Sequence, residues 1–143
     1  MKKGLNENMN SELIRKAGEI ILKQRNFVLT LIDKDGYPSS SVATVSKADG
    51  VKWLTFCSGL GSNKANRTRN NNRACVCFAS EEYSVSFSGD IEIITDPDVK
   101  KEMWYEGLEG HFKGYEDPDY CVFKFTTKRY SLFIDWIEEK GEL

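Results

Sequence analysis

A run of small and hydroxyl-bearing residues that ends in a lysine is suited to holding a phosphate group. The run extends from Phe56 to Lys64 and contains Ser58, Ser62 and two glycines. Hydroxyls and backbone amides form hydrogen bonds with phosphate oxygens, glycines allow a close backbone approach, and lysine adds a positive charge. The run therefore predicts an anion-binding loop that ends at Lys64.

The charge pattern around this loop supports the same prediction. From Gly50 to Ser80 the chain has no aspartate or glutamate and five basic residues, Lys52, Lys64, Arg67, Arg69 and Arg73. This segment has a formal charge of +5 and the whole chain has −2, so the remainder has −7. A basic segment in an acidic protein stabilises an anionic ligand. The alternative is a solvated basic face on a surface helix, because most runs of charge face solvent.

Local signals place the lysine at the start of a helix. Ser62 is a suitable N-cap for a short helix that extends to about Asn70, and Lys64 then lies in its first turn. The helix dipole disfavours a lysine there unless an anion is bound nearby. This position therefore favours the ligand-binding interpretation.

Length and composition set the general class. The 143 residues, 40% hydrophobic and 29% charged, predict one globular domain that spans residues 1–143. No apolar run approaches a membrane span and the N-terminus does not resemble a signal peptide, so we expect a cytoplasmic protein without a membrane partner. The four cysteines are expected to be reduced, and His111, the single histidine, has no ligand-spaced neighbours, so no metal site is predicted. An isoelectric point near 5.5 argues against general nucleic-acid binding.

The remaining pattern is one of short strands joined by tight turns. A first helix is expected from Asn10 or Ser11 to about Gln24, and a later one from Asp96 to about Gly107. The last strand changes its apolar face near residues 127–129, which predicts a β-bulge. Six strands with peripheral helices predict a mostly β fold, a small antiparallel barrel. The expected strands are 27–32, 39–46, 51–57, 74–79, 83–94 and 120–137.

These residues resemble the pyridoxamine 5′-phosphate oxidase-like, FMN-binding split-barrel superfamily. The resemblance is strongest in the order of three segments and one asparagine, namely Phe56-Cys57-Ser58, Ser62-Asn63-Lys64, Asn71 and Ala74–Phe78. Weaker matches extend it over about residues 26–137, and Asp117-Pro118-Asp119-Tyr120 with Trp136 fits the smaller members. Those members are the general-stress-protein-like and nitroimidazole-resistance-like proteins.

The resemblance implies a six-stranded antiparallel split β-barrel that forms a homodimer, with FMN between the subunits. Lys64 would hold the FMN phosphate with Ser62 and Asn63 beside it. Ser58 and Cys57 would also contact the cofactor, with Ser58 near the ribityl chain or ring. The strand after Pro38 would follow the flavin, which makes Ser41 and Val42 candidates, and Trp136 of the partner chain would pack on the isoalloxazine.

The resemblance also has departures that bear on the substrate. The oxidase proper has an arginine and a lysine where this chain has Ser41 and Ser46, and an arginine where it has Asn63. The oxidase's C-terminal arginine and histidine cluster is absent. Pyridoxamine 5′-phosphate is therefore not the expected substrate.

The leading hypothesis is an FMN-dependent oxidoreductase that passes electrons from a small-molecule donor to a small organic acceptor, such as a nitro compound. No catalytic side chain is predicted, because the flavin carries the redox chemistry. A non-enzymatic flavin protein that stores, senses or passes electrons is the alternative. A barrel that binds single-stranded nucleic acid is the third, although the basic segment has no aromatic residue between Ser58 and Ala74 on which bases would stack.

Overall fold

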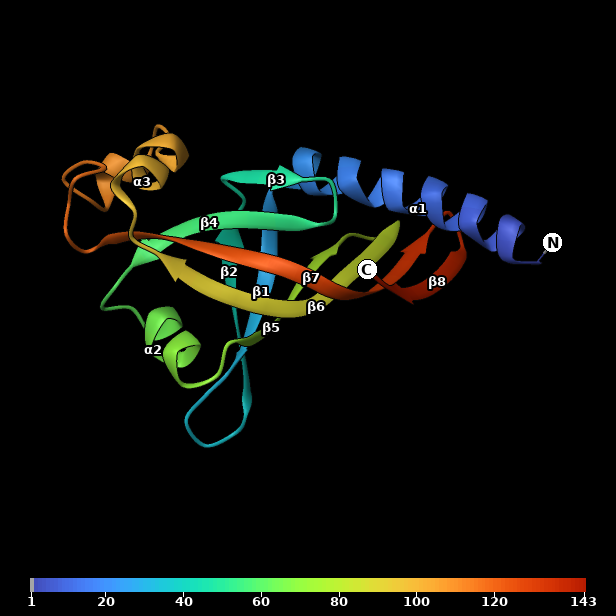
Figure 1. Ribbon diagram of the computed structural model, residues 1–143, viewed down its shortest axis with the longest axis horizontal. Helices are drawn as coiled ribbons and strands as arrows, with labels where there is room; N and C mark the ends of the chain where they lie inside the picture. Colours follow the sequence, from blue (N-terminus) through green and yellow to red (C-terminus); the bar gives the residue numbers. More distant parts are fainter. Residues whose placement is uncertain (1) are drawn as a thin grey trace.

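Figure 1 shows the computed structural model of the chain, in which the backbone is described from Lys2 to Leu143 and the side chains from Glu12 onward. One antiparallel sheet dominates this part, with the strand order β2-β1-β5-β6-β7-β4-β3 and with β8 paired to β7. The strands are β1 Asn26–Ile32, β2 Pro38–Thr44, β3 Lys47–Asp49, β4 Trp53–Gly59, β5 Arg73–Ala79, β6 Tyr83–Ile94, β7 Tyr120–Ile134 and β8 Ile137–Glu142. The helices are α1 Lys2–Gln24, α2 Asn63–Asn70 and α3 Pro97–Met103, with a 3₁₀ turn η1 at Leu108–Gly110.

The sheet curls on itself without closing. Strands β2 and β4 are far apart in the strand order, yet they contact each other across the open side. Helix α2 lies by the end of β4 and contacts β1, β4 and β6 (Figure 1). The result is a half-barrel with its open side between β2 and β4 and with α2 beside the end of β4. A mostly β, antiparallel split barrel with peripheral helices is therefore confirmed.

The concave side of the sheet holds the main core, because the strands alternate apolar and polar residues. Phe27, Phe56 and Phe123 are fully buried there, with Phe56 and Phe123 stacked at 4.9 Å between ring centroids. Helix α1 packs on β3, β5 and β7 through Leu13, Ala17 and Ile21. These contacts fix the strands that carry the loop between β4 and α2.

A second apolar cluster lies on the other face of β4 and β7, under α3. It contains Met103, Leu108, Tyr120 and Val122. The buried Lys100 donates a hydrogen bond from Nζ to the Asp117 carbonyl at 3.0 Å, which ties α3 to the loop before β7. This cluster holds residues 104–119 against the sheet.

Several local predictions are confirmed. The predicted β-bulge is present, since Ser88 pairs with Arg129 while Gly89 pairs with Thr127, which leaves Lys128 unpaired in the ladder. Both Asp-Gly turns form, with positive φ angles of 87° at Gly36 and 54° at Gly50. These features are encoded by neighbouring residues, so local sequence patterns are enough to find them.

Other boundaries are corrected. Helix α1 begins at Lys2 rather than near Asn10, α3 ends at Met103 rather than near Gly107, and β3 and β8 are two additional short strands. The last strand does not run to Ile137, because Asp135 and Trp136 form a turn at φ 54° and 65° and the chain returns as β8. Two-residue hairpin turns with positive φ usually contain glycine or asparagine, so Asp135 followed by Trp136 gave no signal. None of the described helices is both long enough and apolar enough to cross a membrane.

Candidate functional site

The loop between β4 and α2 forms one tight turn followed by a capped helix. The Ser62 amide donates to the Gly59 carbonyl at 3.1 Å, which closes the turn. The Ser62 hydroxyl accepts from the Ala65 amide at 3.1 Å, so Ser62 is the N-cap that the sequence predicts. The turn therefore delivers Asn63 and Lys64 to the first two helical positions of α2.

Two backbone donors and one ammonium group remain available at this end of α2. The first turn of a helix leaves amides without intrahelical acceptors, and the cap satisfies only that of Ala65. The amides of Asn63 and Lys64 are the remaining ones. The Lys64 side chain is half-buried and forms no salt bridge or hydrogen bond within the part of the chain whose side chains are described. Together with the positive end of the helix dipole, these groups favour an anion.

The glycines of the loop accommodate a carboxylate of the protein itself. Asp119 accepts hydrogen bonds from the Leu60 amide through its carbonyl, at 2.7 Å, and from the Gly61 amide through Oδ1, at 3.1 Å. A Cβ atom at Gly59 would lie 2.6 Å from Asp119 Oδ2, so a side chain at this position would displace the carboxylate. The sequence patterns did not identify Asp119 as a site residue, because its contact with the loop depends on the pairing of β4 with β7. The only signal was its place in the segment Asp117-Pro118-Asp119-Tyr120 that carries part of the family resemblance.

Three of the five charges of the basic segment, Lys64, Arg67 and Arg69, lie on α2, and the other two lie elsewhere in the fold. Arg69 donates to the Leu60 carbonyl at 2.9 Å and so supports the loop rather than facing a ligand. Lys52 lies in the turn between β3 and β4, and Arg73 begins β5. Lys64 is thus the basic residue of this segment that the fold places at the start of α2.

The two β4 residues predicted to contact a cofactor face opposite sides of the strand. The half-buried Cys57 thiol lies under α3, 3.7 Å from the Met103 carbonyl and 3.6 Å from the Tyr120 hydroxyl, and burial raises its pKa. Ser58 is half-buried at the loop end of β4, where its carbonyl accepts from the Cys121 thiol at 3.3 Å. The structure therefore groups Ser58 with the loop and the Cys57 side chain with the second cluster.

The remaining predicted residues lie on separate surfaces of one protomer. Ser41 is half-buried on β2, the strand that borders the open side of the barrel. Val42 points the other way and is 67% exposed, opposite Val28 on β1. Trp136 is 90% exposed in the turn between β7 and β8, with its ring edge-on to Phe133 at 5.9 Å.

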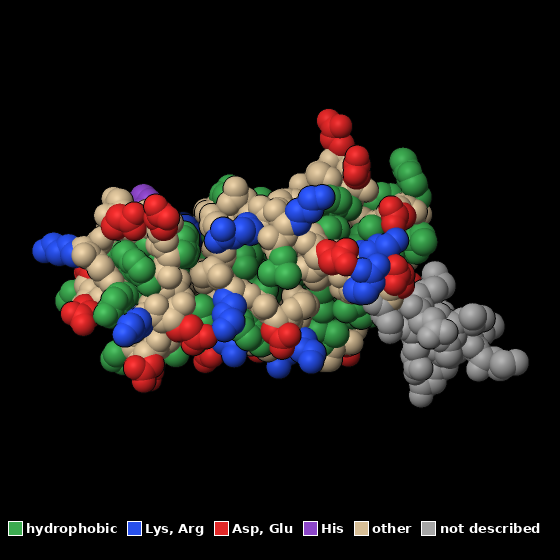
Figure 2. All heavy atoms as spheres, turned by 90° about the horizontal axis from the view of Figure 1, so that it is seen from above, with side chains coloured by type: hydrophobic (Ala, Val, Ile, Leu, Met, Phe, Trp, Pro, Cys, Tyr) green, Lys and Arg blue, Asp and Glu red, His purple; other side chains and the backbone are tan. Residues whose placement is uncertain are grey.

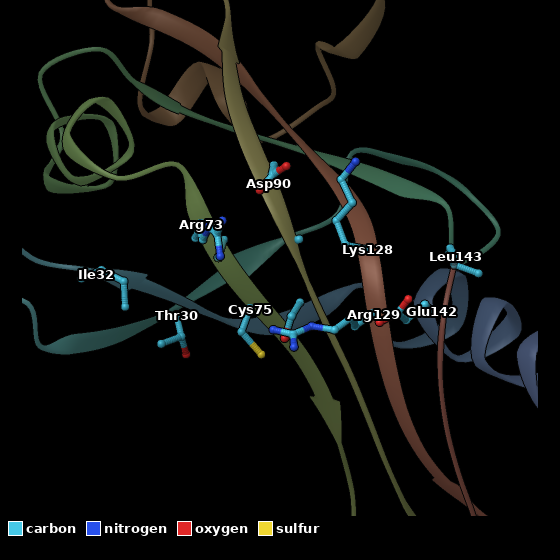
Figure 3. Close-up of a pocket in the computed structure, with 12 residues that line it drawn as sticks. Thr30, Ile32, Arg73, Cys75, Asp90, Lys128, Arg129, Glu142 and Leu143 are labelled. Carbon is cyan, nitrogen blue, oxygen red and sulfur yellow. The ribbon is translucent and has the colours of Figure 1, made fainter.

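A groove of about 700 Å³ lies on the convex face of the sheet, away from the loop. The β-bulge directs both Lys128 and Arg129 to it, and Figure 3 shows the Arg129 side chain reaching across β6 toward Cys75. Arg73 also lines the groove, as do the acidic residues Asp90 and Glu142. Charges of both signs are likewise interspersed on the α1 side of the molecule (Figure 2).

Comparisons with known proteins identify the family. A family model described as pyridoxamine 5′-phosphate oxidase matches residues 13–133. The solved structure of general stress protein 26 from Bacillus anthracis is 25% identical over 92% of this chain and 98% of that chain, with a TM-score of 0.80. No curated protein sequence matches the chain.

Two further solved structures share the fold at lower identity. A pyridoxamine 5′-phosphate oxidase-related, FMN-binding protein from Nostoc punctiforme is 12% identical over 91% of this chain and 93% of that chain, with a TM-score of 0.65. A heme-binding protein from Mycobacterium smegmatis is 13% identical over 91% of this chain and 57% of that chain, with a TM-score of 0.74. Because the family model matches most of the length of this chain, the chain belongs to the pyridoxamine 5′-phosphate oxidase-like, FMN-binding split-barrel family.

Proposed function

We propose that this protein binds FMN at the open side of the half-barrel, with the flavin phosphate at the start of α2. The observation that carries the proposal is the half-buried Lys64, which has no ion-pair or hydrogen-bond partner among the described residues and lies beside the Asn63 and Lys64 amides at the start of α2. A phosphate and a ribityl chain both accept hydrogen bonds, and these groups together with the hydroxyls of Ser58 and Ser62 can donate them. Ser41 on β2 borders the same open side and is assigned to the flavin's edge.

When bound, FMN supplies reversible one- and two-electron chemistry. The chain's own residues then bind and orient the cofactor, and the proposed reaction is reduction of a small organic acceptor by a small-molecule donor. The half-buried Cys57 thiol has a raised pKa and contacts Tyr120, so we assign it a supporting position under α3.

We further propose that two copies associate through the convex face of the sheet, with the flavin at their boundary where this face meets the open side at β2, the strand that carries both Val42 and Ser41. A row of uncharged residues crosses five strands there, from Val42 through Val28, Cys77 and Ser86 to Ser131. Small side chains permit close approach of a second sheet, and Val28 and Val42 are exposed apolar groups. In such a dimer the exposed Trp136 becomes available to the partner's flavin.

The cofactor assignment is tested by the visible spectrum of the purified protein before and after FMN is added. We expect the flavin bands of the bound fraction to shift and sharpen, and the flavin fluorescence to change at saturation. A spectrum equal to the sum of protein and free FMN would refute the assignment. A Soret band on adding haem, without any flavin response, would instead favour the chemistry of the heme-binding relative.

Turnover and assembly need their own measurements. NAD(P)H oxidation that depends on FMN and on a nitro compound or quinone would support the enzyme, whereas flavin binding without turnover would support an electron-carrier or sensor. Light scattering should give a dimer for the wild type and a monomer for Val28→Arg. Leu22→Arg is the matched control, because Leu22 is an exposed apolar residue on α1. A dimeric Val28→Arg protein would contradict the proposed interface.

A further inference from the structure

We propose that Asp119 is a positioning residue for the phosphate loop, and this inference rests on the FMN function proposed above. Asp119 is more than fifty residues from the loop in sequence but contacts it twice, through its carbonyl to the Leu60 amide and through Oδ1 to the Gly61 amide. With the closing bond from Ser62 to Gly59, every backbone amide from residue 60 to residue 62 has a partner within the protein. The turn is therefore fixed before any ligand arrives.

A second contact holds the loop from the side of α2. Arg69 of α2 donates to the Leu60 carbonyl at 2.9 Å, opposite the amide that donates to Asp119. Asp119 is itself held by Asp117, whose Oδ1 accepts from the Asp119 amide at 2.9 Å and whose Oδ2 accepts from the Lys113 amide at 3.0 Å. The loop of residues 113–119 thus acts as a support that sets the direction of the first turn of α2, where Asn63 and Lys64 present their amides.

A carboxylate in this place has two opposing effects on a bound phosphate. Its hydrogen bond orders the turn, which favours binding, because a preformed site loses less conformational freedom. Its negative charge repels a dianion, which disfavours binding. An asparagine keeps the oxygen acceptor and removes the charge, so Asp119→Asn separates the two effects from each other, while Asp119→Ala removes both.

The test compares the FMN dissociation constants of the wild type, Asp119→Asn and Asp119→Ala, with riboflavin as the ligand that lacks the phosphate. Asp119→Asn should bind FMN at least as tightly as the wild type. Asp119→Ala should bind about fivefold more weakly than Asp119→Asn, which corresponds to the loss of one neutral hydrogen bond to the Gly61 amide. Riboflavin binding should be equal in both variants. If both variants bind FMN equally tightly, Asp119 acts only through its charge or through stability, and the positioning role is wrong.

A second measurement works without a ligand and keeps this proposal separable from the FMN function. Amide hydrogen exchange in the apo protein should speed up at Gly61, Ser62 and the first turn of α2 in Asp119→Ala but not in Asp119→Asn. Faster exchange at Gly61 alone would overturn the positioning role. Gly59→Ala should have the same effect on exchange as Asp119→Ala, because the added Cβ displaces the carboxylate. The double variant Gly59→Ala/Asp119→Ala should exchange no faster than either single variant. Wild-type protein that binds no FMN would refute the proposed function and leave this exchange result to decide the role of Asp119.

Discussion

Replacing Lys64 with alanine should weaken FMN binding while leaving the apo protein folded. The Lys64 side chain makes no hydrogen bond or ion pair with the described residues, so its removal breaks no polar contact with them. It also lies in the first turn of α2, where the helix dipole opposes a positive charge by about 0.3–1 kcal/mol. The apo Lys64→Ala protein should therefore be as stable as the wild type or slightly more stable.

The expected loss of affinity follows from the exposure of this lysine. Two unit charges 4 Å apart interact by about 4 kcal/mol at an effective dielectric constant near 20. Lys64 is only half-buried, so solvent screens part of this energy. A hydrogen bond to a charged group contributes about 1.5–3 kcal/mol, which corresponds to an FMN dissociation constant raised about 10- to 150-fold.

The assay is a titration of flavin fluorescence at low ionic strength, with riboflavin run in parallel. Riboflavin affinity should not change in Lys64→Ala, because riboflavin lacks the phosphate that Lys64 is proposed to contact. Lys52→Ala is the matched control, since it removes one positive charge from an exposed site in the same basic segment. Equal weakening of FMN binding in Lys52→Ala and Lys64→Ala would show that only long-range charge matters, and an unchanged Lys64→Ala would remove Lys64 from the site.

Three further predictions concern the fold that positions the loop. Gly89→Ala should lower the free energy of unfolding in urea by about 3 kcal/mol or more, because a Cβ there would lie 1.9 Å from the Thr126 carbonyl oxygen; a loss below about 1 kcal/mol would contradict this. Thr68→Val should raise the free energy of unfolding by about 1 kcal/mol, because the Thr68 hydroxyl is buried and has no hydrogen-bond partner in the described part of the chain. A destabilised Thr68→Val protein would show that the Thr68 hydroxyl is hydrogen-bonded in the folded protein. Burial raises the pKa of Cys121 from 9.0 to about 12, so above pH 9 the unfolded chain loses this proton while the folded chain keeps it. Stability should therefore fall from about pH 9 to about pH 12, less steeply in Cys121→Ala, and an unchanged slope in that variant would contradict the assignment.

Much of the fold could be predicted because its signals are local. Strand β6 alternates apolar and polar residues along its length, and the parity change near Thr127 marks the bulge within the sequence of β7 itself. The turn at Asp135 and Trp136 could not be predicted, because it needs positive φ at residues that seldom adopt it. The three-residue strand β3 is too short for its periodicity to be read from the sequence.

Parts of the candidate site could be predicted from local sequence and parts could not. The cap at Ser62 and the position of Lys64 follow from neighbouring residues, and both were predicted. The contact of Asp119 with Gly61 needs the register of β4 against β7, in which Gly59 pairs with Tyr120, and no single segment encodes that. The separation of Cys57 from Ser58 follows from the sequence, because successive residues of a strand face opposite sides.

The central claim is that the loop before α2 holds the phosphate of a flavin. The most direct measurement is the ratio of the riboflavin to the FMN dissociation constant for the wild-type protein, because these ligands differ only in that phosphate. We predict a ratio of about ten or more, the effect of at least one charge-assisted hydrogen bond. Equal affinities, or no saturable binding of either flavin, would contradict the claim.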